Sequence, residues 1–253
     1  MKRILDKRAL APALLVAAYG LASYALFVVT LAWGIAFVAD LPVPRTVNRG
    51  PAGPALHAVI VNVLLFVAFG LQHSVMARSG FKRAWTRVVP PAIERSTYVL
   101  VSSLAFGALM AFWRPIAQPV IWGVDNANVA LFLRALSWLG WLLVVTSSFL
   151  INHFEMLGLQ QVAARVFGLP APASEFRTPL LYRHVRHPLY LGFLLAFWAT
   201  PRMTAGHLLF AAAGTAYILV GVHFEERDLV TLFGERYRAY QREVGKLLPR
   251  WTR

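Results

Sequence analysis

The sequence contains no cysteine, and this absence removes several kinds of chemistry at once. Disulfide bonds, thiolate-bound metals, iron–sulfur clusters and a cysteine nucleophile supplied by the chain all require a thiol. Histidine is also scarce, with seven residues in 253. Membrane di-iron oxygenases use many more histidines, usually in paired blocks, and only His184-Val-Arg-His187 comes close to such a block. We therefore expect no metal site.

Charged residues are few, and acidic residues are the fewest. The chain is 14% charged, with 11 acidic and 25 basic residues, and 58% hydrophobic with a mean hydropathy of +0.58. A soluble domain of this size could not bury so much apolar surface, so the composition predicts an integral membrane protein.

Four long apolar runs and a pair of shorter ones account for this composition. The long runs, which predict four N-terminal spans within residues 1–151, are residues 9–39, 56–75, 97–113 and 129–151. The shorter runs, residues 188–200 and 208–222, predict a helical hairpin that turns at Pro201 and Gly206. We expect residues 1–253 to form one all-α polytopic membrane domain with about five to six transmembrane helices.

The segments outside these spans include two that resemble surface helices. Residues 155–167 predict an amphipathic helix, and the tail from Glu225 predicts a basic amphipathic helix on the membrane surface. Residues 152–253 would therefore comprise a polar loop, the hairpin and this terminal helix.

Lysine and arginine alternate between the predicted loops in a way that fixes the orientation. With the N-terminus inside, 20 of the 25 basic residues lie in inner segments and four in outer ones, with Arg134 near the outer end of the fourth span. This bias predicts that both termini are cytoplasmic and that the basic residues contact anionic lipids. A nucleic-acid footprint would instead gather on one soluble domain, so we expect no nucleic-acid partner.

One polar stretch, residues 182–192 (Y-R-H-V-R-H-P-L-Y-L-G), carries candidate chemistry. The residue before a proline is pushed toward extended geometry, so a helix should begin at Pro188 with His187 just outside it. The unpaired amides at that helix start favour an anion beside Arg183 and Arg186. The structural alternative is a basic cluster that only obeys the positive-inside rule.

Two later positions in this stretch have roles that suit a bound molecule. Gly192 would let a bulky group approach the helix one turn in, and Tyr190 could stack or donate a hydrogen bond.

A second polar stretch follows the hairpin and begins with Glu225-Glu226. We expect these carboxylates at the C-terminal end of a helix, where they would oppose its dipole and so must have another purpose. Pairing with Arg183, Arg186 or Arg227 is the structural alternative, whereas binding an ammonium group or ribose hydroxyls is the functional one. With the nearby aromatic side chains, the two stretches would suit a zwitterionic nucleoside. These aromatic residues are Phe193, Phe197, Trp198, Tyr237 and Tyr240.

The order of these motifs resembles a known family. R-H-P-L-Y-L-G, then E-E-R-D-L-V-T-L-F-G-E-R-Y-R-A-Y and Pro249, is similar to the C-terminal signature of the isoprenylcysteine carboxyl methyltransferase superfamily, over residues 182–249. Its members are integral membrane enzymes that use S-adenosylmethionine. The resemblance implies a cytoplasmic pocket for this cofactor, lined by Tyr182, Arg186, His187, Pro188, Tyr190, Gly192, Glu225, Glu226, Tyr237 and Tyr240.

Three N-terminal motifs narrow the resemblance to the NnrU-like branch of that superfamily. They are Q-H-S-V-M-A-R (72–78), E-R-S-T-Y-V-L (94–100) and N-H-F-E-M-L-G-L-Q-Q-V (152–162). Within the branch they look most like bacterial enzymes that convert methanethiol to dimethyl sulfide, which implies a small thiol substrate and the bacterial inner membrane. A prenylcysteine carboxylate or a lipid headgroup as acceptor, and a non-catalytic membrane accessory protein, remain alternatives.

Methyl transfer from a sulfonium to a thiolate removes charge, so a site of low dielectric suits it. The thiol must first lose a proton. Candidate bases near the cytoplasmic ends of the predicted spans are His73, Glu94, His153 and Glu155. We expect His73 and His153 near the acceptor thiol, helped by Glu94 or Glu155. The alternative is that these histidines cap helix ends or pair with the two glutamates.

Overall fold

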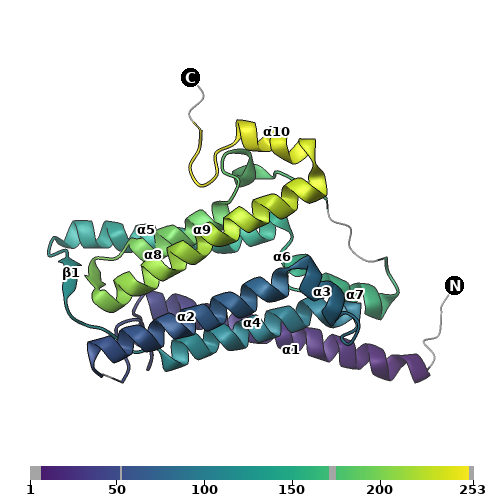
Figure 1. Cartoon of the computed structure of the whole chain (residues 1–253), viewed down its shortest axis with the longest axis horizontal. Coiled ribbons are helices and arrows are strands. Elements are labelled where there is room, and N and C mark those ends of the chain that lie inside the picture. Colours follow the sequence, from purple (N-terminus) through teal and green to yellow (C-terminus); the bar gives the residue numbers. More distant parts are fainter. Residues whose placement is uncertain (1–6, 52, 171–174, 251–253) are drawn as a thin grey trace. The chain divides into compact units, whose positions relative to one another are not determined.

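The computed structural model describes residues 7–51, 53–170 and 175–250 (Figure 1). Its long helices are α1 (Lys7–Val38), α2 (Ala55–Ala77), α4 (Pro91–Phe112), α5 (Ala127–Ile151) and α9 (Ala205–Phe233). Its shorter helices are α3 (Ser79–Trp85), α6 (His153–Met156), α7 (Leu159–Phe167), η1 (Leu180–Arg183), α8 (Pro188–Trp198) and α10 (Glu235–Glu243). Two short strands in the described ranges are β1 (Val120–Gly123) and β2 (Arg202–Thr204).

Five helices of the described ranges are long and apolar enough to cross a membrane, which confirms an all-α integral membrane protein. They are Ala11–Val38 within α1, and α2, α4, α5 and α9. Helix α8 has 11 residues and is therefore about 16 Å long, too short to cross a hydrocarbon core of about 30 Å. Helix α9, with 29 residues, is about 44 Å long and extends beyond such a core.

The chain forms two compact units. Unit 1 comprises Met1–Ala32, Ala68–Ala108 and Asn152–Glu175. Unit 2 comprises Trp33–Val67, Leu109–Ile151 and Phe176–Arg253, and it contains the hairpin of α8 and α9.

In unit 2, helices α5, α8 and α9 lie side by side (Figure 1). Two glycines face each other where α5 meets α8: a Cβ atom on Gly140 would lie 2.6 Å from the Gly192 carbonyl oxygen, and the reverse distance is also 2.6 Å. The Ser137 hydroxyl donates across the same interface to the Ala196 carbonyl oxygen at 3.1 Å. Small residues of this kind let membrane helices approach closely and bond across the contact.

The core of unit 2 is aromatic. Phe37, Phe66 and Trp113 all lie with their ring centroids within 5.7 Å of the Phe210 ring. A buried amide fastens this core to the end of α4, because Asn62 donates to the Arg114 carbonyl oxygen at 2.8 Å and accepts from its amide at 2.9 Å. Asn62 thus pairs backbone groups just beyond α4 that no helix satisfies.

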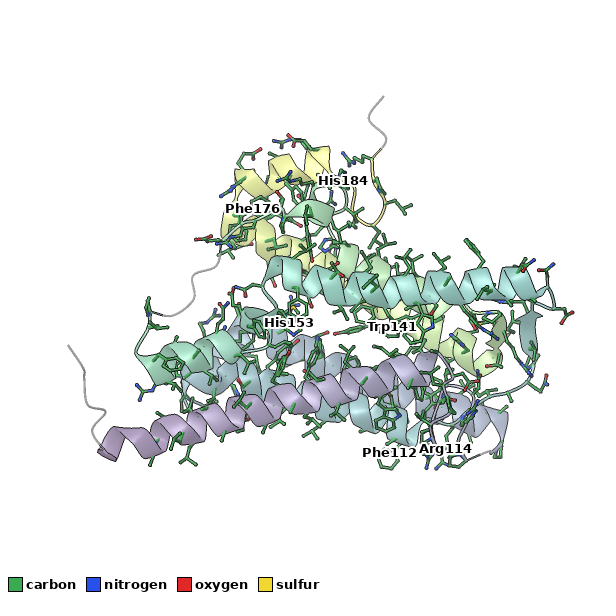
Figure 2. All side chains as sticks on the ribbon, turned by 180° about the vertical axis from the view of Figure 1, so that it is seen from behind. Phe112, Arg114, Trp141, His153, Phe176 and His184 are labelled. Carbon is green, nitrogen blue, oxygen red and sulfur yellow. The ribbon has the colours of Figure 1, made fainter. Side chains whose placement is uncertain are left out.

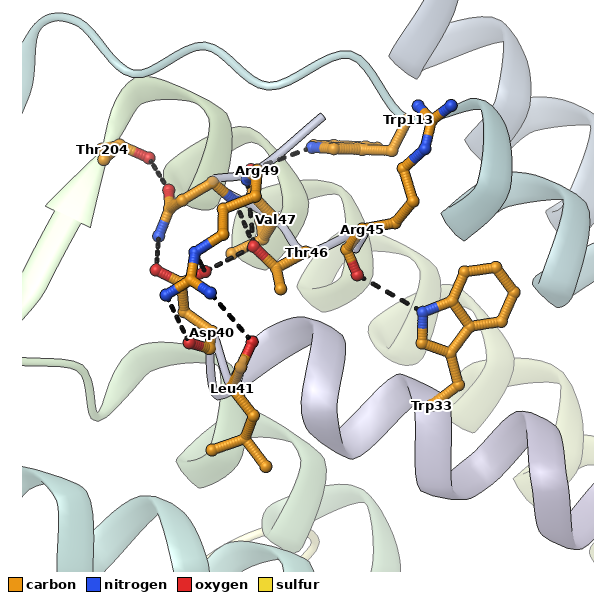
Figure 3. A network of polar contacts seen from close by, with 10 residues as sticks. Trp33, Asp40, Leu41, Arg45, Thr46, Val47, Arg49, Trp113 and Thr204 are labelled. Atoms are coloured by element: carbon orange, nitrogen blue, oxygen red, sulfur yellow. Dashed lines mark hydrogen bonds and ion pairs between the residues drawn. The ribbon is translucent and has the colours of Figure 1, made fainter. Parts of the chain in front are cut away.

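A polar network ties the loop after α1 to the start of α9 (Figure 3). Thr46 and Asn48 both donate to the Asp40 carboxylate, the latter at 3.2 Å. Thr204 donates to the Asn48 side-chain oxygen at 2.7 Å and also caps α9 by accepting from the His207 amide at 3.1 Å. The network thus fixes the beginning of α9.

Helix α9 is longer than the predicted arm of residues 208–222, and this corrects the expectation that Glu225 and Glu226 end a helix. The charges after Val222 end the apolar run, but glutamate, arginine and leucine are good helix formers and no glycine or proline interrupts them. The helix ends before Gly234, whose φ of 59° suits glycine. The two carboxylates therefore lie inside a continuous helix.

Two other connections also differ from expectation. The hairpin turn contains β2, which pairs antiparallel with β1, and Gly206 lies in the first turn of α9, where a Cβ atom would be 2.8 Å from the Ile116 amide nitrogen. The predicted helix over residues 155–167 is interrupted at Gly158, which has a φ of 88°. A Cβ atom at Gly158 would lie 2.7 Å from the Ser96 amide nitrogen, so a close approach to α4 explains the break.

The glycine contact between α5 and α8 can be tested with one methyl group. Gly140→Ala should destabilise the protein by about 1–3 kcal/mol, because the added carbon meets backbone atoms that cannot rotate away. Gly107→Ala is the matched control: it lies in α4 with no atom within 4 Å of its Cβ position, so it should be neutral or slightly stabilising. Thermal unfolding in detergent compares the two, and an equally stable Gly140→Ala protein would contradict the close packing.

Candidate active site

The start of α8 is built as the sequence predicts. Pro188 is the first helical residue and His187, with φ −127° and ψ 63°, precedes the helix. Because this segment is not yet helical, its backbone can pair elsewhere. The amides of Arg186 and His187 donate to the carbonyl oxygens of Gly245 and Lys246 at 2.9 and 3.1 Å. The C-terminal segment thus lies along the entry to α8.

Arg186 and Glu226 form a buried ion pair, which joins the two polar stretches that the sequence singles out. The Arg186 Nε atom lies 2.8 Å from Glu226 Oε1, and both residues are less than a tenth exposed. A second guanidinium nitrogen of Arg186 donates to the carbonyl oxygens of Gln241, at 3.0 Å, and Val244. Arg186 therefore holds α9 and the C-terminal segment together.

Glu226 receives two further contacts. His187 Nε2 lies 3.2 Å from the same oxygen, and Lys246 Nζ lies 3.3 Å from the other oxygen. The structural alternative considered for the glutamates, pairing with Arg186, thus applies to Glu226. Arg183 and His184 are exposed, whereas the Arg186 guanidinium is directed at the Glu226 carboxylate.

Glu225 lies on a different side of α9 and meets another residue of α8. The Tyr190 hydroxyl donates to Glu225 Oε2 at 2.8 Å. The Tyr190 ring is 5.6 Å from the His187 ring, so both α8 residues line the same region. Glu225 is half-buried, which keeps its carboxylate within reach of a bound molecule.

Three predicted tyrosines connect η1 to α10. Tyr240 donates to the Tyr182 carbonyl oxygen, and Tyr182 donates to the Ser147 carbonyl oxygen at 3.2 Å. Phe176, which lies beside α10 in Figure 2, packs its ring against those of Tyr237 and Tyr240. Burial raises the pKa of Tyr240 to about 12 and also raises the pKa values of Tyr182 and Tyr237, so all three remain neutral at physiological pH.

Gly192 is brought against α5 rather than toward these side chains. A Cβ atom there would meet Gly140 and Val144, the latter at 2.9 Å. The bulky group expected near this glycine is therefore a neighbouring helix, and packing accounts for the residue.

A hollow of about 340 Å³ lies beside Glu226, between α9 and α10. This volume is within the range of small-molecule sites. Its lining residues are His223, Glu226, Arg227, Val230, Thr231 and Gln241. Apart from Glu226, none of them was a candidate from the sequence. Gln241 comes from α10, whereas the other lining residues lie on α9 at spacings of three and four, which is the pattern of one helix face. This signal becomes visible once α9 is known to continue to Phe233.

The candidate base His73 belongs to unit 1 and is held by two hydroxyl groups. Its Nε2 atom lies 2.8 Å from the Tyr98 hydroxyl oxygen, and its Nδ1 atom lies 3.1 Å from Ser102 Oγ. Glu94, the other candidate of this region, is half-buried in the first turn of α4, where a carboxylate favours the helix dipole.

His153, also in unit 1, is buried among aromatic rings. Its Nε2 atom lies 3.1 Å from the Tyr24 hydroxyl oxygen, and the rings of Tyr24, Phe27 and Phe154 surround it. Burial lowers the pKa of His153, so the imidazole is neutral near pH 7 and able to accept a proton. Glu155 accepts a hydrogen bond from Asn152 at 2.8 Å, which is local to α6.

Across residues 7–51, 53–170 and 175–250, no group of three or more histidine, aspartate or glutamate side chains is arranged to hold a metal ion. The two polar groups of interest are thus the carboxylate cluster of unit 2 and the histidine clusters of unit 1.

Comparison with known proteins gives close relatives along most of the chain. No family model and no solved structure matches it. A methanethiol S-methyltransferase of Mycobacterium tuberculosis is 55% identical, over 91% of this chain and 94% of that protein. Methanethiol S-methyltransferase 1 of Bradyrhizobium diazoefficiens is 52% identical, over 93% and 82%. A methanethiol S-methyltransferase of Pseudomonas deceptionensis is 50% identical, over 84% and 80%. These relatives confirm the resemblance found in the motifs, and the chain belongs to the methanethiol S-methyltransferase family.

Proposed function

We propose that the chain is an S-adenosylmethionine-dependent methyltransferase that converts methanethiol to dimethyl sulfide. The observation that carries the proposal is the carboxylate cluster of unit 2, where Arg186 and His187 converge on Glu226 while Tyr190 donates to Glu225. Two such carboxylates, one of which lines a hollow, are suited to a nucleoside with a positive charge. The names of the relatives support a methyl transfer to methanethiol.

The residues present fit S-adenosylmethionine. When bound, this cofactor supplies a methyl group on a positively charged sulfur. Sugar hydroxyl groups are hydrogen-bond donors, and Glu225 and Glu226 offer carboxylate oxygens to accept them. The Gln241 amide in the hollow can both donate to and accept from a base. Four further residues would support the site indirectly, by fixing the carboxylates and the C-terminal segment. They are Arg186, Tyr182, Tyr237 and Tyr240.

The acceptor thiol would be deprotonated by a group of unit 1. His73 and His153 are the proposed proton acceptors, helped by Glu94 or Glu155, and Glu155 follows His153 by two residues. Apolar surroundings favour a reaction in which a thiolate and a sulfonium lose their charges together.

We further propose that the protein lies in the bacterial inner membrane with both termini in the cytoplasm. The distribution of lysine and arginine over the loops supports this orientation.

The activity can be tested with membranes that contain the protein. Given S-adenosylmethionine and methanethiol, they should release dimethyl sulfide into the headspace, as measured by gas chromatography. Membranes without the protein are the control. Transfer to a prenylcysteine or a lipid headgroup but never to methanethiol would replace the proposed acceptor, and no methyl transfer with any of these would point to an accessory protein.

The cofactor site can be tested with Glu225→Gln, which keeps the shape of the side chain but removes its charge. We expect the KM for S-adenosylmethionine to rise about tenfold or more, because a charged acceptor is lost, and Tyr190→Phe to raise it about fivefold. Glu235→Gln, on an exposed glutamate of α10 that pairs with Arg242, is the matched control and should leave KM unchanged. Equal KM values in all three variants would remove Glu225 from the site.

The orientation can be tested with single cysteines, since the chain has none of its own. Asp125→Cys, in the loop before α5, should react with a membrane-impermeant maleimide in intact cells. Ser79→Cys, just after α2, should react only after the cells are opened. The opposite pattern would invert the proposed topology.

A further inference from the structure

A polar cluster of unit 1 joins the end of α2 to α4, and three of its four members have no role so far. It consists of Gln72 and His73 on α2 and Tyr98 and Ser102 on α4. The Ser102 hydroxyl oxygen lies 3.1 Å from His73 Nδ1 and accepts from the Gln72 amide nitrogen at 3.3 Å. All four side chains belong to helices that can span a membrane, where polar groups are costly and mark functional sites.

One atom of this cluster lacks a partner. The oxygen of the Gln72 side chain is buried and has no hydrogen bond to any residue in the described ranges, although its amide nitrogen also meets the Met76 sulfur at 3.1 Å. A buried carbonyl without a donor is costly to keep. A ligand that brings a hydrogen-bond donor to this place would remove that cost.

The bonds around His73 limit how it can receive a proton. Both ring nitrogens already face hydroxyl groups, Tyr98 on one side and Ser102 on the other. A neutral imidazole has one donor and one acceptor nitrogen, so one hydroxyl donates to it and the other accepts. Since Ser102 is the one that also contacts Gln72, a proton that arrives beside Gln72 can reach His73 through Ser102.

The surroundings of the cluster suit a small uncharged thiol. The Phe69 ring lies 5.5 Å from the His73 ring, and Met76 borders Gln72, so the flanks are apolar. The Arg95 guanidinium lies 6.0 Å from the centre of the Tyr98 ring and supplies a nearby positive charge. A positive charge favours a thiolate over a thiol, and it also favours the later release of a proton from a charged imidazole.

We propose that Gln72, His73, Tyr98 and Ser102 form the site that binds the acceptor thiol and removes its proton, an inference that rests on the proposed function. The thiol donates its S–H to the Gln72 oxygen when it binds. Its proton then passes to Ser102 Oγ while the Ser102 proton moves to His73 Nδ1, which leaves a thiolate and an imidazolium. Tyr98 accepts from Nε2–H and is a positioning residue.

In the methyl transfer itself, one bond forms and one bond breaks. The thiolate electron pair forms a bond to the methyl carbon of a sulfonium donor, and the electrons of the broken carbon–sulfur bond stay on the donor sulfur. Both products are neutral at sulfur. The proton on His73 is released to water before the next thiol binds.

The test is the rate of dimethyl sulfide formation by Ser102→Ala over a range of pH. At neutral pH we expect kcat to fall about a hundredfold with the KM for S-adenosylmethionine unchanged. The loss should shrink as the pH rises toward the pKa of the thiol, because the thiolate then forms without help. Gln72→Leu should instead raise the KM for the thiol about fivefold.

Matched controls separate this role from a structural one. Ser103→Ala changes the neighbouring buried serine of α4, and Tyr19→Phe removes a hydroxyl that bonds Thr97 of the same helix at 2.9 Å. Both should keep wild-type kcat and pH dependence. Ser102→Thr retains a hydroxyl and should recover most of the activity, and thermal unfolding confirms that each variant is folded.

The two proposals fail in different ways. If the wild-type protein methylates methanethiol but Ser102→Ala resembles Ser103→Ala, or loses activity equally at all pH values, the thiol site is overturned and the function stands. If the wild-type protein methylates no thiol, both are overturned.

Discussion

The buried ion pair between Arg186 and Glu226 is the interaction on which the proposed cofactor site depends. It joins a residue before α8 to one near the end of α9. The same guanidinium also donates hydrogen bonds to two carbonyl oxygens of the C-terminal segment. Removing one partner of a buried pair leaves an uncompensated charge, which costs about 3–5 kcal/mol. The pair therefore holds the carboxylates, η1 and α10 in a single arrangement.

The rest of unit 2 supports this arrangement through contacts of a different kind. The glycines of α5 and α8 bring backbones together, the aromatic core fills the space around Phe210, and the Thr204 cap fixes where α9 begins. From that fixed start, α9 carries Glu225 and Glu226 along a continuous helix. The positions of Glu225 and Glu226 thus depend on helix packing and on the Thr204 cap, which lie farther along the same helices.

Much of this was visible in the sequence, because apolar length and proline position act locally. The four N-terminal spans and the helix start at Pro188 follow from such patterns, and the signature motifs indicated that the two polar stretches would meet. The end of α9 was not visible, since a drop in hydropathy resembles the end of a helix and only Gly234 provides the stop. The role of Gly192 and the hydroxyl partners of His73 were also hidden, because each depends on which neighbouring helix packs there.

The order in which the chain is made gives the C-terminal segment a further significance. Arg186 is synthesised and inserted with α8, whereas Gln241 and Val244, whose carbonyls it binds, leave the ribosome more than fifty residues later. Until then the guanidinium lacks two of its final hydrogen-bond acceptors. A nascent chain that stops short of this segment would carry every span but lack these two acceptors. The hydrogen bonding of Arg186 is therefore completed only after translation has passed α10.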